Sequence, residues 1–304
     1  MKQLYGKLWV KCTAIALLVV FAVLFAASAL GSAYLIRYGA FADGGDQVRQ
    51  MAENNILQQT RGDGWTAALA RQWQLGLETI AFSYAPLLDD SAALPRAREE
   101  IHGISSLWLH APFAELIPCA IDPLARDVAM RRFRQALDAA QALGIRRMVF
   151  HGGFIPHVYF PEWYVEQSVW FWREFLRDVP ADMTLALENV MEPSPETLVS
   201  IAAQIDDPRL GLCLDVGHAN TCVSETPPMD WIAPMAPWLR HVHLHNNQGD
   251  TDLHAPLGEG NIPMRQIIDT VLQAAPEATF TIENQNALPS LHWLAAQGYI
   301  EEPT

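Results

Sequence analysis

Short apolar runs alternate with longer amphipathic stretches from about residue 51 to the end of the chain. The short runs predict eight β-strands, at 56–60, 77–84, 106–110, 147–151, 184–189, 210–215, 240–246 and 279–284. Between them, apolar residues recur three and four positions apart and predict helices, the longest at 126–143. Eight strand–helix pairs within residues 51–304 match a (β/α)8 TIM barrel, an α/β fold that typically needs about 250 residues.

A doubly wound open sheet is the other α/β architecture that fits such an alternation. The open sheets that bind dinucleotides carry a glycine-rich G-x-G-x-x-G turn after the first strand. No such turn follows the first predicted strand here. The pattern therefore favours the closed barrel.

The first fifty residues form a separate segment with a different composition. Residues 12–36 contain no charged side chain, and as a helix they would measure about 37 Å, enough to cross a bilayer. Because Lys2, Lys7 and Lys11 precede it, a transmembrane helix would leave the N-terminus in the cytoplasm and residues 51–304 outside. Two alternatives stay open. The small residues at 27–33 suit a signal-peptide cleavage site, and a true start at Met51 would make the chain cytoplasmic.

The charged residues of the chain disfavour nucleic acid as a partner and exclude catalysis that depends on lysine. The chain has a net charge of −14, and residues 51–304 hold 15 Arg against 32 Asp and Glu. Such a surface repels a phosphate backbone, which disfavours nucleic acid as a partner. No lysine follows Lys11, which excludes Schiff-base catalysis and a phosphate-loop lysine in residues 51–304. Four cysteines in 304 residues do not make a disulfide scaffold.

Side chains that can bind a metal ion gather at the ends of the last six predicted strands and in the loop after the seventh. In a barrel all strand C-terminal ends lie at one rim, where the active sites of such enzymes are built. The sequence therefore predicts that these residues converge. They are His110, His151, Glu188, Asp215, His218, His243, His245, Asp252, His254 and Glu283.

Several carboxylates and imidazoles brought together out of water need a counter-charge, which no lysine can supply here. A divalent metal is the simplest one, and a set of His and carboxylate ligands suits Zn²⁺, Mn²⁺, Fe²⁺, Co²⁺ or Mg²⁺ without choosing among them. His241, His243 and His245 share one face of their strand. We expect His243 to be a ligand and His245 to contact the substrate or a neighbouring group. Trp108 and Phe113 are candidates for a wall against which a sugar packs.

The motifs around these residues resemble those of the xylose isomerase-like TIM barrels, over about residues 54–300. That superfamily joins sugar and sugar phosphate isomerases and epimerases with apurinic-site nucleases of the endonuclease IV type. No single motif is specific, but the set is. It comprises Leu-His110-Ala-Pro, His151-Gly-Gly, Leu-Glu188-Asn, Asp215-x-x-His218, His243-Leu-His-Asn, Asp252-x-His254-x-x-Leu-Gly-Glu-Gly and Glu283-Asn.

The resemblance implies two possible metal sites at the C-terminal ends of the strands, one for each branch of the superfamily. In the isomerase branch one metal is held by two Glu, one Asp and one His, which correspond to Glu188, Glu283, Asp215 and His243. There Glu188 and Glu283 would move a proton off and onto a carbon of the sugar, the metal would stabilise the enediolate, and His218 would polarise a substrate oxygen.

In the nuclease branch up to three zinc ions share nine ligands and cleave phosphodiesters. All nine have a counterpart in this chain, because His110, His151, His218, Asp252 and His254 add to the four above. Asn246 stands where both branches often carry Asp, and no DNA-binding loops are recognisable. The sequence therefore ranks a metal-dependent isomerase or epimerase of a small sugar or sugar phosphate first and a zinc phosphodiesterase second. A binding protein built on an inactive barrel is third. The oligomeric state is left open.

Overall fold

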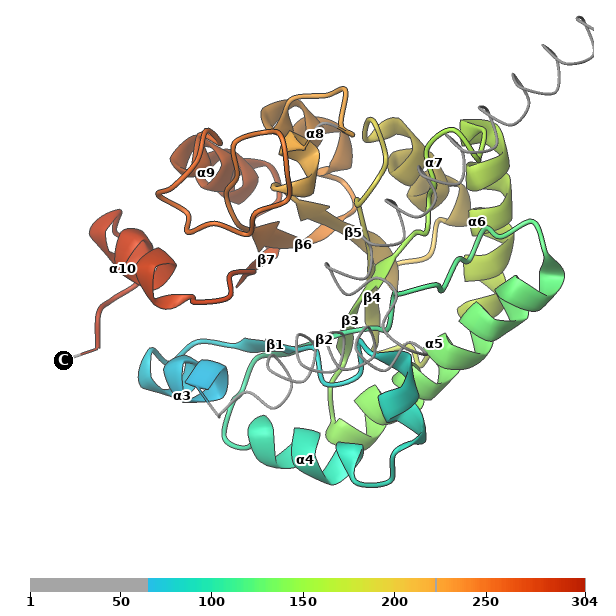
Figure 1. Cartoon of the computed structure of the whole chain (residues 1–304), viewed down its shortest axis with the longest axis horizontal. Coiled ribbons are helices and arrows are strands. Elements are labelled where there is room, and N and C mark those ends of the chain that lie inside the picture. Colours follow the sequence, from blue (N-terminus) through green and yellow to red (C-terminus); the bar gives the residue numbers. More distant parts are fainter. Residues whose placement is uncertain (1–64, 222, 304) are drawn as a thin grey trace, which may run out of the picture. The chain divides into compact units, whose positions relative to one another are not determined.

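The computed structural model describes residues 65–221 and 223–303. Within these residues, seven parallel strands form one sheet in chain order, curved into a nearly closed barrel with helices on its outside (Figure 1). The strands are β1 (Leu77–Thr79), β2 (Leu107–His110), β3 (Arg147–His151), β4 (Thr184–Glu188), β5 (Leu210–Asp215), β6 (Leu239–Leu244) and β7 (Thr279–Ile282).

A helix follows each strand, and local capping signals fix where several of these helices begin and end. The Asp122 side chain accepts a hydrogen bond from the Leu124 amide at the start of α5, which ends at Gly144 in the left-handed conformation. The helices are α3 (Trp65–Gln72), α4 (Ala93–Glu100), α5 (Pro123–Leu143), α6 (Pro161–Phe175), α7 (Glu196–Ile205), α8 (Pro228–Met235), α9 (Met264–Ala274) and α10 (Leu288–Ala296), with 3₁₀ turns η2 (Ala85–Asp89) and η3 (His218–Asn220).

Apolar side chains fill both sides of the sheet. The larger cluster lies between the strands and the surrounding helices, and it includes Phe133 and Trp172. A smaller one occupies the barrel interior and consists of Trp108, Val149, Ala186 and Cys213. Each of these four residues lies two positions before the last residue of its strand, and therefore on the same face. The inner cluster thus forms a floor under the strand ends.

The sequence predicts most of these elements closely, and β5 within the same bounds. The predicted strand 77–84 ends at Thr79, because the Ala81 amide donates to the Thr79 hydroxyl and the Ser83 amide to the Ile80 carbonyl, which turns the chain. The predicted strand 56–60 and the predicted membrane helix 12–36 lie outside the described residues. No helix within the described ranges is long and apolar enough to span a membrane.

Candidate metal centre

The strands bring the predicted donor residues to one end of the barrel. His110, His151, Glu188 and Asp215 are the last residues of β2, β3, β4 and β5. The register places His151 beside Glu188 and Asp215 beside His243. Because strands in this register end together, these side chains gather above the inner apolar floor.

A first donor group consists of His110, His151 and Glu188. One carboxylate oxygen of Glu188, Oε2, lies 3.3 Å from Nε2 of both His110 and His151. The other ring nitrogen of His110, Nδ1, lies 2.9 Å from the Ala111 carbonyl, and a bond donated to that carbonyl leaves Nε2 free to bind a cation. Potential ligand atoms of the three residues all lie within 4.8 Å of one another.

A second donor group consists of Glu188, Asp215, His243 and Glu283. The buried Nδ1 of His243 has no hydrogen-bond partner. It lies 3.6 Å from Glu188 Oε2, 3.7 Å from Asp215 Oδ2 and 3.7 Å from Glu283 Oε2. These separations are too long for hydrogen bonds, and a cation between the four atoms would satisfy the nitrogen and neutralise the carboxylates. The residues therefore fit a metal ion.

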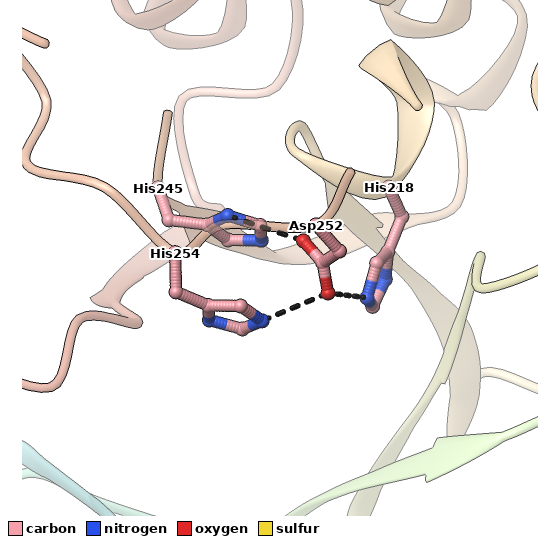
Figure 2. Close-up of side chains that lie close together, drawn as sticks. All are labelled: His218, His245, Asp252 and His254. Carbon is pink, nitrogen blue, oxygen red and sulfur yellow. Dashed lines mark hydrogen bonds and ion pairs between the residues drawn. The ribbon is translucent and has the colours of Figure 1, made fainter. Parts of the chain in front are cut away.

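A third donor group consists of His218, His245, Asp252 and His254 (Figure 2). Oδ2 of Asp252 lies 3.3 Å from His218 Nε2 and 2.9 Å from His254 Nε2. The remaining ring nitrogens of His218 and His254 lie 2.9 Å and 2.8 Å from backbone carbonyl oxygens, which orients the Nε2 atoms toward Asp252. Asp215 and Glu188 also lie within reach of His218, so the three groups adjoin.

His245 belongs to the interior of this cluster. The sequence predicts that it contacts the substrate or a neighbouring group of the site. Its side chain is fully buried, and Nε2 lies 3.0 Å from both carboxylate oxygens of one such group, Asp215. Its ring stacks on His254 with centroids 3.9 Å apart. It also lies so close to Gly217 that a Cβ there would approach His245 Cε1 to 1.9 Å. His245 therefore positions Asp215 rather than facing the solvent.

Glu78 contacts the candidate site, and the sequence analysis missed it. Its carboxylate oxygen Oε2 lies 2.9 Å from His241 Nε2 and 3.1 Å from His243 Nε2, and it accepts a hydrogen bond of 2.8 Å from the Thr281 hydroxyl. It links β1 to β6 and β7 across the barrel interior and turns Nδ1 of His243 toward the second donor group. The available signal was an acidic residue between the two buried residues of a strand, Leu77 and Thr79.

Charge pairing sets the pKa values of the donors without metal. Burial lowers the pKa of His243, but nearby anionic groups, among them Glu78, Glu283 and Glu188, raise it well above the usual value. Burial raises the pKa of Asp215, but His218 and His245 hold it well below the ordinary range. These pKa directions favour a protonated His243 when no metal is bound, so metal binding at this residue would displace its proton.

His254 gives a testable consequence of this pairing. Burial lowers its pKa, but the hydrogen bond to Asp252 and the charges of Glu283 and Asp252 raise it to about 9. Zinc needs the neutral imidazole, so binding at pH 7.5 should release a proton, and affinity should increase with pH up to about 9. Calorimetric titration with Zn²⁺ in two buffers of different ionisation enthalpy measures the release. His254→Gln should release fewer protons than the native chain, and equal release would contradict this assignment.

The two aromatic candidates lie in different places. The expectation for Trp108 is wrong, because it is 4% exposed and stacks on His241 within the barrel interior, with ring centroids 4.2 Å apart. It lies below the donor residues because it precedes the rim residue His110 by two positions. Phe113 lies at the rim, 37% exposed, and stacks on His151 with centroids 4.5 Å apart.

Two relatives by sequence cover about three fifths of the chain. A protein of Methanocaldococcus jannaschii is 28% identical over 188 residues, which make up 59% of this chain and 64% of that protein. A probable endonuclease 4 of Mycobacterium ulcerans is 24% identical over 195 residues, or 59% of this chain and 75% of the relative. The chain thus spans less than two thirds of the length of the first relative.

Solved structures and a family model agree on the fold. A Thermus thermophilus protein soaked with ZnCl2 is 30% identical with a TM-score of 0.62, over 75% of this chain and 91% of that one. A D-tagatose 3-epimerase-like protein is 24% identical with a TM-score of 0.60, over 69% and 83% of the two chains. The model of the xylose isomerase-like TIM barrel matches residues 68–300. The chain therefore belongs to the xylose isomerase-like TIM barrel family.

Proposed function

We propose that the chain is a metal-dependent hydrolase that cleaves phosphodiester bonds of a small molecule at a centre of up to three divalent ions. The observation that carries this proposal is that the first, second and third donor groups adjoin at one end of the barrel. A single-metal isomerase needs only the second of them. In a single-metal isomerase the first and third groups would bind no ion. The pairing of His151 with Glu188 and of His254 with Asp252 would then have no role in metal binding.

The charge of the centre supports the same choice. The carboxylates of the donor groups are Glu188, Asp215, Asp252 and Glu283, four negative charges when all are ionised. Three divalent ions outweigh these charges and attract an anionic ester, whereas one ion leaves the centre negative and repels it. No Arg or Lys lies between a strand end and the next α-helix in the described chain, so bound ions are the available source of positive charge there.

The exposure of the donor side chains supports one direction of approach for a substrate. The side chain of Glu188 is 1% exposed and that of Asp215 is fully buried, whereas Glu283, His254 and Asp252 are 29%, 33% and 35% exposed. A substrate therefore approaches past Asp252, His254 and Glu283. Glu188 has both oxygens beside imidazoles, which suits a ligand better than a group that carries protons to and from a substrate carbon.

Hydrolysis consumes one water, whose oxygen bonds to phosphorus while the bond from phosphorus to the leaving oxygen breaks. Bound divalent ions would supply Lewis acidity and lower the pKa of water in this step. Glu283 directs only Oε2 toward the donor imidazoles, and burial raises the pKa of this carboxylate, so we assign its other oxygen, Oε1, to accept the proton of the attacking water. The proton then passes to the leaving oxygen or to solvent.

A metal-dependent sugar isomerase or epimerase is the second candidate, and one observation favours it. Glu188 ends β4 and Glu283 follows β7, and each has a carboxylate oxygen within 3.7 Å of His243 Nδ1. Such a pair suits transfer of a proton between two faces of a carbon. On this alternative Glu283 remains accessible, but Glu188 would have to leave its imidazole neighbours.

The two candidates differ in metal content and product. We expect about three zinc ions per chain by elemental analysis, and hydrolysis of bis(4-nitrophenyl) phosphate that a chelator abolishes. Asp252→Asn should remove one ion and most of the activity, whereas Asp250→Asn, an exposed change in the same segment, should leave both unchanged. One ion per chain, no hydrolysis, and incorporation of solvent deuterium into a ketose would overturn the hydrolase and establish the isomerase.

A further inference from the structure

The two ends of the barrel carry opposite kinds of exposed side chain. Segments that run from a strand to the following α-helix, at the end where the donor groups lie, contain no Arg or Lys in the described chain. At the other end, the helix-to-strand segments carry Arg146, Arg177 and Arg209, and none of their described residues is an exposed large apolar one. At the donor end, such exposed side chains include Phe113, Ile155, Val158, Phe160, Met191 and Leu253.

Three of these apolar residues lie on the segments that carry donor residues, and one of them contacts a donor. Phe113 stacks on His151 of the first group. Met191, 44% exposed, comes three residues after Glu188, and Leu253, 57% exposed, stands between Asp252 and His254 of the third group. Single exposed apolar residues are ordinary on a protein surface, but a set that adjoins a polar site is typical of ligand recognition.

The arginines in the first turns of the helices at the donor end form hydrogen bonds or ion pairs with other residues of the chain. Arg96, in α4, forms an ion pair of 2.8 Å with Asp90. Arg126 donates to the Ala120 carbonyl and to Gln167, and Arg265 donates to Gln297. A polyanion would therefore find apolar surface around the centre rather than cationic side chains.

We infer that the substrate carries an alkyl or aryl group on its phosphate, which packs on Phe113, Met191 and Leu253 while the phosphate lies over the donor groups. This inference rests on the proposed function and specifies its substrate class. Burial of one apolar group of this size against such side chains corresponds to about tenfold or more in affinity. These three residues would be determinants of specificity.

Two esters with one leaving group test the inference. We compare phenyl 4-nitrophenyl phosphate with methyl 4-nitrophenyl phosphate on the zinc-loaded chain, and expect kcat/KM to favour the phenyl ester by about tenfold or more, through KM. Phe113→Ala should remove most of this preference, Phe113→Leu should keep part of it, and Leu253→Ser should lower it. Leu272→Ala, an exposed apolar position on α9, is the matched control and should leave it unchanged.

Each outcome separates the inference from the proposed function. Equal kcat/KM for the two esters, or loss of both activities alike in Phe113→Ala and Leu253→Ser, overturns the inference and leaves the hydrolase standing. Hydrolysis of neither ester by the zinc-loaded chain overturns the hydrolase itself. A long-chain alkyl 4-nitrophenyl phosphate offered free and in phosphatidylcholine vesicles identifies the source of the apolar group, since faster turnover in vesicles indicates a lipid and faster turnover in solution a soluble ester.

Discussion

Glu188→Gln is expected to lower kcat/KM for phosphodiester hydrolysis by about 10³-fold, which corresponds to several kcal/mol of transition-state stabilisation. Glu188 belongs to both the first and second donor groups. Its Oε2 lies 3.3 Å from His110 and His151, and its Oε1 lies 3.2 Å from Nδ1 of His218. A neutral amide of the same size cannot supply an anionic oxygen to two metal positions.

The measurement is kcat/KM together with elemental analysis, because both rate and metal content should decline. Glu196→Gln is a suitable control, since Glu196 is an exposed residue of the first turn of α7. Full zinc content with unchanged hydrolysis in Glu188→Gln would show that this carboxylate is not a shared ligand.

Glu78→Gln is expected to weaken metal binding by about 10- to 100-fold, although Glu78 need not touch the metal. Its carboxylate holds His243 Nε2 at 3.1 Å and so directs Nδ1 into the second donor group. Without metal, loss of the charge leaves protonated His243 in a buried position, and the free energy of unfolding should decrease by about 3 kcal/mol or more.

Zinc titration of the metal-free chain gives the affinity, and urea denaturation of the same preparation gives the stability. Glu99→Gln, an exposed change on α4, controls for a general loss of negative charge. If Glu78→Gln lowered stability but left zinc affinity unchanged, Glu78 would be a structural residue and its positioning role would be wrong.

The order of elements was predictable because a parallel barrel repeats one pattern. A buried strand reads as an apolar run, a covering helix reads as apolar residues three and four apart, and the residue after the run lies at the rim. This logic finds His110, His151, Glu188 and Asp215 without any knowledge of side-chain positions.

Depth within the barrel was harder to predict than position along a strand. Trp108 and His110 share a face, but only the packed structure shows that the indole lies among Val149, Ala186 and Cys213 beneath the donors. Glu78 escaped notice because one acid in a short strand commonly faces solvent. Alternation within the strand indicates only that Glu78 faces away from Leu77 and Thr79. Its burial depends on the curvature of the sheet, which brings β1 near β6 and β7.

Asn246, where related motifs often have Asp, anchors the segment that carries Asp252 and His254 of the third donor group. Its side-chain nitrogen donates to the carbonyls of Leu257 and Ile262, and its side-chain oxygen accepts from the amides of Asn247 and Ile262. A carboxylate in its place could accept these amides but could not donate to the carbonyls. An amide does not ionise, so acidification that releases bound metal ions would leave the hydrogen bonds of Asn246 intact. The segment that carries Asp252 and His254 would then keep its position and could bind metal again when the pH is raised.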